Sequence, residues 1–272
     1  MTSPLDVLAH RVEGAGEPLV LLNGGMMSFG AWEPLAARLR ERHRVVRCDF
    51  RGQLLSPGTP PKLLSGHADD VARLLDELGF GRVHLLGTSF GAYVALLFAA
   101  RHLGRAASVI AATVTDVVGE EMGEGGGALR SACRDALAGG EKSKVYDLIV
   151  EMAYSPAWQE AKKSEIAERR AQARLLPDTW FEGLLGLLDA LEGFDLRPHL
   201  DAVRCPVLVV AAGEDAVMPP ERTEAAARAI RGAELVVLEG SGHAVILERE
   251  AEFLELATRF LAGVATRAEA AS

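Results

Sequence analysis

The amino-acid sequence predicts an α/β protein with a mostly parallel, doubly wound sheet and an inserted all-helical cap. Residues 18–22 and 206–211 are short and continuously apolar, as expected for strands that are buried on both faces. Segments with helical spacing of apolar residues alternate with such strands, which is typical of a parallel sheet covered by helices on both sides. Between residue 119 and about residue 195 the alternation stops and only helical segments remain, which indicates an insertion.

The elements of the core are expected in a simple order along the chain. A glycine-containing turn at residues 14–16 separates the first two strands, and Gly79 is expected to end a helix in which Val71 and Leu75 share the buried face. The expected strands are 5–13, 18–22, 44–48, 83–86, 107–112, 206–211 and 234–238, and the expected core helices are 30–42, 67–79, 90–103, 221–231 and 248–263.

The segment of residues 119–195 is expected to be a cap, or lid, inserted into a core domain of residues 1–118 and 196–272. An insertion between strands at the carboxyl edge of a parallel sheet would cover the side on which such sheets bind ligands. Glu165 and Arg169 lie one helical turn apart and are expected to form an ion pair. After a flexible glycine-rich start at 123–127, the expected cap helices are 127–138, 142–152, 157–175 and 178–191.

The composition is that of an ordinary folded protein, since 49% of the 272 residues are hydrophobic and 25% are charged. The formal net charge is −9 and the sequence has no dense run of lysine or arginine, so nucleic acid and anionic membranes are unfavourable partners. The sequence shows neither a signal-peptide pattern nor an apolar run of about 18 residues. We therefore expect a cytoplasmic monomer or homodimer that acts on a small molecule.

Three cysteines, Cys48, Cys133 and Cys205, lie far apart and form no C-x-x-C pattern. Their number and spacing argue against a disulfide framework or a structural zinc site and favour buried thiols. The glycines at residues 14–16 precede a strand and lack the third glycine of the dinucleotide-binding pattern. No metal and no cofactor are therefore expected.

The stretch Gly87-Thr88-Ser89-Phe90-Gly91 lies between an expected strand and an expected helix. So sharp a reversal holds the central serine in a strained conformation, and side chains two residues before or after it would collide with neighbouring backbone. Glycine at both flanks avoids this collision. The Ser89 hydroxyl is then exposed above the sheet beside a helix N-terminus, which is the position of a nucleophile.

Two later strands end close to residues that can activate such a serine. Asp215 follows the penultimate strand, and His243 follows the last strand in a glycine-flanked loop. Because the carboxyl ends of parallel strands lie at one edge of the sheet, we expect Ser89, Asp215 and His243 to meet there. Asp116, which follows the strand before the cap, is the alternative acid.

Each of these residues has a chemical role in the expected site. His243 would take the proton of Ser89 and later return it to the leaving group, a task suited to imidazole. Asp215 would fix the histidine tautomer and stabilise the imidazolium. The expected donors to the developing oxyanion are the backbone N–H groups of Gly25 and Phe90, with that of Met26 as the alternative.

These residues resemble the motifs of the α/β-hydrolase superfamily, in particular the capped serine hydrolases that include carboxylesterases, enol-lactonases and C–C bond hydrolases. The resemblance covers nearly the whole chain and implies the α/β-hydrolase fold. The chain order of serine, aspartate and histidine is the one expected for that fold. The matching segments are the oxyanion loop at residues 21–25, a D-x-R-G turn at 49–52, the elbow at 87–91, and residues 213–215 and 240–243.

Two positions depart from the pattern of that family. Asn23 stands where most relatives have histidine, and it is expected to brace the oxyanion loop. Leu54 stands where the family has a second glycine, which implies a different turn beside the pocket. Gln53, next to this turn, is a candidate substrate contact.

The resemblance implies hydrolysis of a carboxylic ester or lactone through an acyl-Ser89 intermediate. Hydrolysis of a C–C bond or a thioester by the same triad is the alternative, and a non-catalytic small-molecule binding protein is the remote one. Phe90 is also expected to border an apolar pocket. The apolar side chains on one face of the helix expected at 178–191, which continue to Leu188, either line this pocket or only pack against other helices. The candidate pocket residues are Met26, Gln53, Trp180, Phe181 and Leu184.

Overall fold

The computed structural model describes residues 8–56 and 58–270, which form a seven-stranded sheet in the order β1-β3-β2-β4-β5-β6-β7. β1 runs antiparallel to β3, and all the other neighbouring strands pair in parallel. The prediction of a mostly parallel sheet is therefore confirmed. The strands are β1 (His10–Glu13), β2 (Pro18–Leu22), β3 (Arg44–Cys48), β4 (Val83–Thr88), β5 (Ala106–Ala112), β6 (Val207–Ala212) and β7 (Glu234–Leu238).

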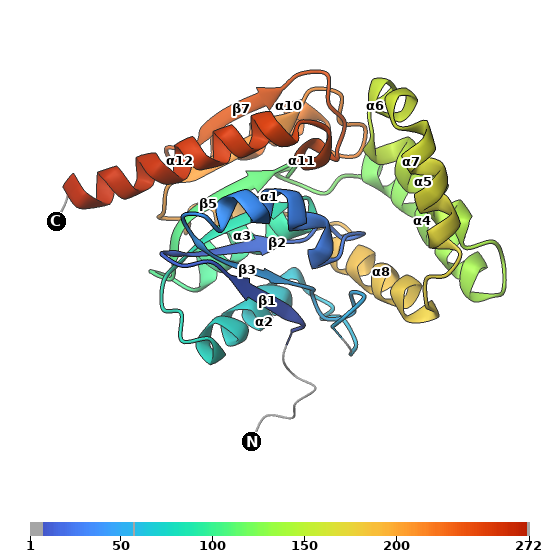
Figure 1. The fold of residues 1–272 in the computed structure, drawn as a ribbon, viewed down its shortest axis with the longest axis horizontal. Helices are drawn as coiled ribbons and strands as arrows, with labels where there is room; N and C mark the ends of the chain where they lie inside the picture. The colour runs from blue at the N-terminus through green and yellow to red at the C-terminus, as the bar shows by residue number, and fades with distance from the viewer. Residues whose placement is uncertain (1–7, 57, 271–272) are drawn as a thin grey trace.

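From β2 onward, helices separate successive strands along the chain, and they surround the sheet (Figure 1). The core helices are η1 (Phe29–Trp32), α1 (Glu33–Leu39), α2 (Leu64–Glu77), α3 (Phe90–Arg101), α9 (Arg197–Leu200), α10 (Pro220–Ala229), α11 (Val245–Glu248) and α12 (Glu250–Ala270). A further group, here called the helical insertion (residues 120–191), lies between β5 and β6 and comprises α4 (Glu120–Leu137), α5 (Ser143–Ala153), α6 (Pro156–Ala161), α7 (Lys163–Ala173) and α8 (Asp178–Leu191).

Both faces of the sheet are buried against helices. Along β2, Leu19 and Leu21 pack in a cluster with residues of α1 and α12, whereas Val20 and Leu22 pack in a cluster with residues of α2 and α3. This division follows from the two-residue period of a strand, which points successive side chains to opposite faces. The doubly wound arrangement predicted from the continuously apolar strands is therefore confirmed.

The helical insertion has its own small core and begins and ends at neighbouring points. Leu129, Val145, Phe181 and other apolar residues from α4, α5 and α8 form a separate buried cluster. At its base, the N–H of Val118 donates to the carbonyl of Phe194 at 2.8 Å, and Val117 and Asp195 form an isolated β-bridge. Figure 1 shows the insertion as a separate layer of helices beside one edge of the core.

Several boundaries differ from the expected ones. The expected helix at 157–175 is interrupted at Lys162, whose φ of −112° and ψ of 20° are not helical. The glycine-rich residues 123–127 belong to α4, because packing of α4 against α5 and α8 outweighs a cost of about 1 kcal/mol per glycine. The first strand begins at His10, and residues 5–7 of the expected strand lie outside the described residues.

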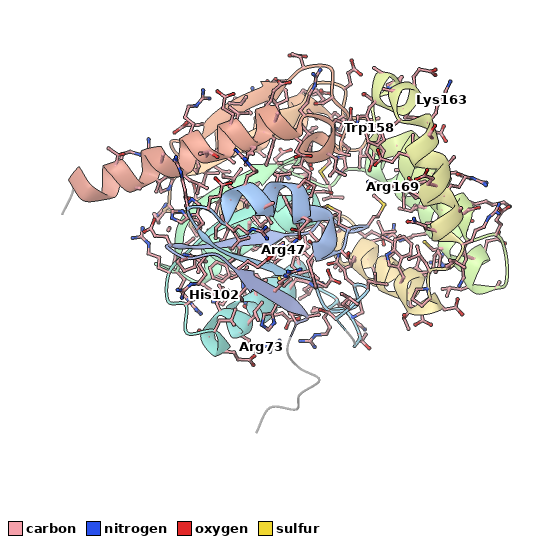
Figure 2. The ribbon with its side chains drawn as sticks, viewed as in Figure 1. Arg47, Arg73, His102, Trp158, Lys163 and Arg169 are labelled. Carbon is pink, nitrogen blue, oxygen red and sulfur yellow. The ribbon has the colours of Figure 1, made fainter. Side chains whose placement is uncertain are left out.

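A buried arginine ties the antiparallel edge of the sheet to the helices. Arg47 on β3, labelled in Figure 2, is 1% exposed. It forms ion pairs with Glu13 on β1 and, at 2.8 Å, with Glu33 on α1. Its charge is acceptable in the interior because two carboxylates compensate it. Among the described helices, none combines the length and the apolar character that crossing a membrane requires.

Candidate active site

The serine of the glycine-flanked stretch lies at the junction of β4 and α3. Ser89 has a φ of 52° and a ψ of −121°, and a positive φ is uncommon for a residue with a side chain. A Cβ at Gly87 would lie 2.2 Å from the Gly91 carbonyl oxygen, and a Cβ at Gly91 would lie 2.2 Å from the Leu22 carbonyl oxygen. The expected steric need for both glycines is therefore confirmed.

His243 and Asp215 come together beyond the carboxyl ends of β7 and β6. The Nδ1 atom of His243 lies 2.9 Å from Oδ2 and 3.1 Å from Oδ1 of Asp215, whose side chain is completely buried. The backbone N–H groups of Val217 and Met218 donate to Oδ1 of Asp215 at 2.9 and 2.7 Å. These bonds hold the carboxylate in place and orient the histidine ring so that Nδ1 faces it.

Asp116, the alternative acid, has a different partner. Its Oδ1 atom lies 3.1 Å from Nη2 of Arg222 on α10. The carbonyl of Asp116 accepts a hydrogen bond from the N–H of Leu196 at 2.9 Å, where the chain returns from the helical insertion. The geometry therefore places Asp215, and not Asp116, against His243.

A tight turn after β2 lies against the serine. The N–H of Met27 donates to the carbonyl of Gly24 at 3.1 Å, so Gly25 and Met26 occupy the two central positions of a β-turn. A Cβ at Gly24 would lie 3.7 Å from Cβ of Ser89, which shows how closely the turn approaches the elbow. Within the described chain, the N–H groups of Gly25 and Met26 donate to no protein acceptor.

Asn23 braces this turn from below, as expected. Its side chain donates to Oδ1 of Asp49 and to Oε1 of Gln53, each at 3.0 Å, and accepts from Nε1 of Trp32 at 2.8 Å. Burial raises the pKa of Asp49, although hydrogen bonds from Phe29, Leu55 and Asn23 act in the opposite direction. The fully buried network fixes the backbone that precedes Gly24.

Gln53 does not line the cavities at Ser89, contrary to its prediction as a pocket residue. Its Nε2 atom donates to the carbonyls of Gly24 and Gly25 at 3.0 and 3.3 Å, and its Oε1 atom also accepts from the N–H of Phe50 at 2.8 Å. The side chain is buried, and it lines neither of the cavities that reach Ser89. Gln53 therefore supports the turn instead of the pocket, whereas its neighbour Leu54 does line the larger cavity.

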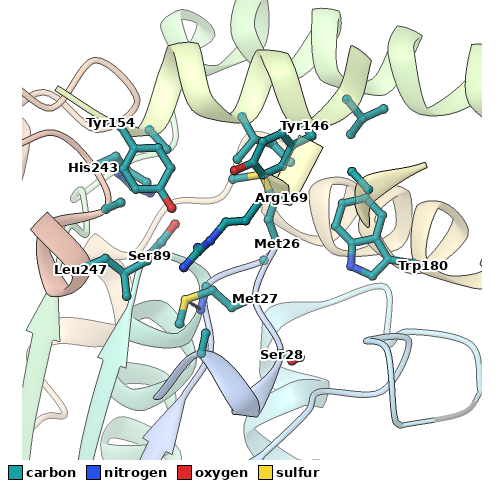
Figure 3. A pocket seen from close by; sticks show the side chains of 18 of the residues that line it. Met26, Met27, Ser28, Ser89, Tyr146, Tyr154, Arg169, Trp180, His243 and Leu247 are labelled. Atoms are coloured by element: carbon teal, nitrogen blue, oxygen red, sulfur yellow. Dashed lines mark hydrogen bonds between the residues drawn. The ribbon is translucent and has the colours of Figure 1, made fainter. Parts of the chain in front are cut away.

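Two cavities meet at Ser89. The larger has a volume of about 330 Å³ and the smaller of about 250 Å³, and Ser89, His243, Met26 and Ile149 line both. Figure 3 shows Ser89 and His243 facing the larger cavity beneath α5 and α7. A substrate whose reacting carbonyl lies at Ser89 could therefore extend to either side.

The side chains of the helical insertion that were predicted for the pocket divide between the two cavities and the core of the insertion. Trp180 lines the larger cavity, and Leu184 and Leu188 line the smaller one, together with Phe90. Phe181 is the exception, because its side chain is completely buried in the core of the helical insertion with Nζ of Lys142 5.4 Å above its ring. The prediction that Phe181 lines the pocket is therefore wrong.

Sequence reasoning missed much of the wall of the larger cavity, including the polar side chains of Tyr146, Tyr154 and Arg169. Arg169 forms the expected ion pair with Glu165, at 2.6 Å, and in the sequence this pair is typical of a solvated helix face. Tyr146, Ile149 and Ala153 also line this cavity, and their spacing of three and four residues places them on one face of α5. The spacing of these residues on one helix face was the sequence signal that could have identified them as cavity residues.

Glu248 connects the helical insertion to the histidine loop. Its Oε1 atom accepts from the N–H groups of Ser155 and Gly242 at 3.0 and 3.1 Å, and its Oε2 atom accepts from the Ser155 hydroxyl at 2.6 Å. The N–H of Ala244 donates to the carbonyl of Ala153 at 2.8 Å. The residues on both sides of His243 are thereby held against the end of α5.

The sheet order, the serine elbow and the buried aspartate–histidine pair together define a class of hydrolytic enzymes. In agreement, the model of the alpha/beta hydrolase family matches residues 19–256. The chain therefore belongs to the alpha/beta hydrolase family, which confirms the expected superfamily and fold, and it is a hydrolase.

Known relatives differ in the reactions for which they are named. The chain is 27% identical to RutD of Caulobacter sp. (strain K31), over 96% of this chain and 98% of that protein; its name gives a carbamate hydrolase activity and marks it as unproven. It is 29% identical to the pimeloyl-[acyl-carrier protein] methyl ester esterase of Neisseria meningitidis serogroup C, over 92% and 95%. The enol-lactonase of Burkholderia xenovorans LB400 is 25% identical over 94% and 96%, with a TM-score of 0.81.

The close approach at Gly91 predicts a large loss of stability in Gly91→Ala. Its new Cβ would meet backbone atoms of β2, so we expect the free energy of unfolding to fall by about 3 kcal/mol or more in urea denaturation. Gly127→Ala is the matched control, because that glycine lies in α4 with nothing within 4 Å of the added carbon. The control should be as stable as wild type or up to about 1 kcal/mol more stable. Equal stability of both variants would contradict the close approach of Gly91 to the backbone at the end of β2.

The hydrogen bonds of Glu248 predict a smaller but measurable loss in Glu248→Ala. Three donors lose their acceptor, so the free energy of unfolding should fall by about 1–3 kcal/mol. Glu255→Ala, an exposed site on α12, should change it by less than about 0.5 kcal/mol. Thermal denaturation of both variants checks the difference, and a Glu248 variant as stable as the control would rule out the brace.

Proposed function

We propose that this protein is a serine hydrolase that cleaves a carboxylic ester or lactone through an acyl-Ser89 intermediate. The observation that carries the proposal is the placement of Ser89 on the strained elbow, where it lines two cavities with His243, whose Nδ1 lies 2.9 Å from the buried Asp215. A nucleophile, a base and an orienting acid are thus supplied by three strand ends. The names of the esterase and lactonase relatives support the choice of substrate class.

The proposed reaction has two steps. In the first, Nε2 of His243 takes the hydroxyl proton as Oγ of Ser89 attacks the carbonyl carbon, and His243 then protonates the departing alcohol oxygen. In the second, His243 takes a proton from water, the hydroxide attacks the acyl-enzyme, and the proton returns to Oγ of Ser89 as the acid is released. Asp215 stays ionised and stabilises the imidazolium in both steps.

The proposed oxyanion hole combines the turn and the elbow. Phe90 is the first residue of α3, so its N–H has no partner within the helix. Gly25 supplies the second donor, and Met26 next to it on the same turn is the alternative. The positive end of the α3 dipole adds to the stabilisation of the developing charge.

We also propose that residues 119–195 act as a cap over a core of residues 1–118 and 196–272. The helical insertion supplies Tyr146, Ile149 and Trp180 to the wall of the larger cavity at Ser89. Excluding water at this wall would strengthen the hydrogen bonds that hold the oxyanion. Substrate selection would then depend on the cap, and bond cleavage on the core.

The nucleophile assignment predicts that Ser89→Ala loses turnover of 4-nitrophenyl butyrate by at least about 10³-fold. The loss is expected in kcat, because removal of Oγ leaves the cavities intact. Ser131→Ala, on the exposed side of α4, should keep full activity. Wild-type turnover in the Ser89 variant would refute the proposed function.

The acid assignment predicts different effects of two isosteric variants. Asp215→Asn should lower kcat by about 10²–10⁴-fold, because the neutral amide neither fixes the histidine tautomer nor stabilises imidazolium. Asp116→Asn, which breaks only the pair with Arg222, should change kcat by less than about threefold. The opposite pattern in steady-state kinetics would transfer the role to Asp116.

A further inference from the structure

The two cavities at Ser89 differ in the chemistry of their walls. Apart from Ser89 and His243, the side chains that line the smaller cavity are apolar. The larger cavity is lined by two cationic side chains, Lys142 and Arg169, and among its described lining residues there is no aspartate or glutamate. This excess is local, because the chain as a whole has a formal net charge of −9.

One of the two cations is already held by protein groups. Nζ of Lys142 lies 2.8 Å from Oδ1 of Asp178 and donates to the carbonyl of Leu176 at 2.7 Å. It also lies 5.4 Å above the ring of Phe181, at the core of the helical insertion. Lys142 therefore joins α5 to the start of α8, and its ammonium is not directed at the reaction centre.

Arg169 is held more loosely. One nitrogen, Nη2, lies 2.6 Å from Oε1 of Glu165, and Glu165 does not line the cavity. Figure 3 shows the Arg169 side chain extending into the cavity on the side of Ser89, between Tyr146 and Met27. A guanidinium has five N–H donors, so contact with a single carboxylate oxygen leaves donors for a second anion.

The next residue on α7 makes the contrast clear. Arg170 uses Nε and Nη2 in a two-pronged pair with Asp147 on α5, at 2.7 and 2.9 Å, and lines neither of the two cavities at Ser89. That pair is the geometry in which arginine binds a carboxylate. Arg169 has the same guanidinium group, but its side chain extends into the cavity (Figure 3).

Two phenols lie beside Arg169 on the cavity wall. Tyr146 and Tyr154 both line the cavity, and Figure 3 shows their hydroxyls on the cavity side of α5. The hydroxyl of Tyr154, like that of any tyrosine, keeps its proton at neutral pH and can donate a hydrogen bond, and burial raises its pKa further, to about 12. The ring of Tyr154 stacks on Trp158 with centroids 4.1 Å apart, which fixes its direction.

We propose that Arg169 binds a carboxylate of the substrate, so that the substrate is an ester or lactone with an anionic group on one side of the reacting carbonyl and an apolar group on the other. Tyr146 and Tyr154 add hydrogen bonds to this anion, and the smaller cavity takes the apolar group. A carboxylate matches one free guanidinium edge in charge and shape, whereas a phosphate dianion would need further cations. The inference rests on the proposed ester hydrolysis at Ser89.

Two matched pairs of esters test the inference. The first pair places the charge on the acyl group: mono-4-nitrophenyl glutarate against neutral 4-nitrophenyl pentanoate. The second pair places it on the leaving group: 4-carboxyphenyl butyrate against 4-carbamoylphenyl butyrate. We expect wild type to prefer the charged member of one pair by about tenfold or more in kcat/KM, and that pair identifies the side on which the carboxylate binds.

The variant Arg169→Gln should abolish this preference, because KM should rise by about tenfold more for the charged ester than for its neutral partner. Arg174→Gln is the matched control, because Arg174 ends α7, lines neither cavity at Ser89 and pairs with Glu141. This control should keep the preference. Equal effects of Arg169→Gln on both members of a pair, or no preference in either pair, would overturn the inference.

A binding measurement separates this inference from the proposed function. If wild type cleaved none of the four esters, ester hydrolysis would fail, and calorimetric titration with glutarate would decide the role of Arg169. The inference predicts that glutarate binds wild type about tenfold or more tightly than Arg169→Gln. Equal binding to both proteins, or none to either, would overturn it.

Discussion

The site depends on one backbone contact, in which the start of α3 lies directly against the end of β2. Gly91 has no side chain, so the carbonyls of Leu22 and Asn23 approach it more closely than any Cβ would allow. The same contact brings the turn that contains Gly25 up to Ser89. Serine and turn are therefore positioned by a single packing arrangement, and the buried network around Asn23 prevents the turn from moving independently.

The features that depend on strand ends could be predicted from the sequence. Continuously apolar runs show where buried strands stop, and a parallel sheet brings those ends to one edge, which is why Asp215 and His243 could be placed near each other. The support of the turn could not be predicted in this way. The hydrogen-bond partners of Gln53 are determined by three-dimensional packing, and no sequence periodicity indicates which buried groups they are.

The wall contributed by the helical insertion was harder to predict, because a helix turns by about 100° per residue. Trp180 and Phe181 are adjacent in sequence and both aromatic, yet one faces the larger cavity and the other the core of the insertion. The stripe on α8 was recognisable, but its rotation depends on how α8 packs against α4. Arg169 is a similar case, because its pairing with Glu165 conceals its contact with the cavity.

The helical insertion leaves and rejoins the sheet at one place, where Val117 pairs with Asp195 and Val118 bonds to Phe194. β5 and β6 are neighbours in the sheet, and the segment between Val118 and Phe194 begins and ends at the same place. The length of this segment therefore does not alter the register of the strands. Natural variation can therefore lengthen, shorten or replace these helices while the elbow and the histidine loop keep their geometry. This modular construction gives a physical reason why one scaffold can evolve selectivity for many different molecules.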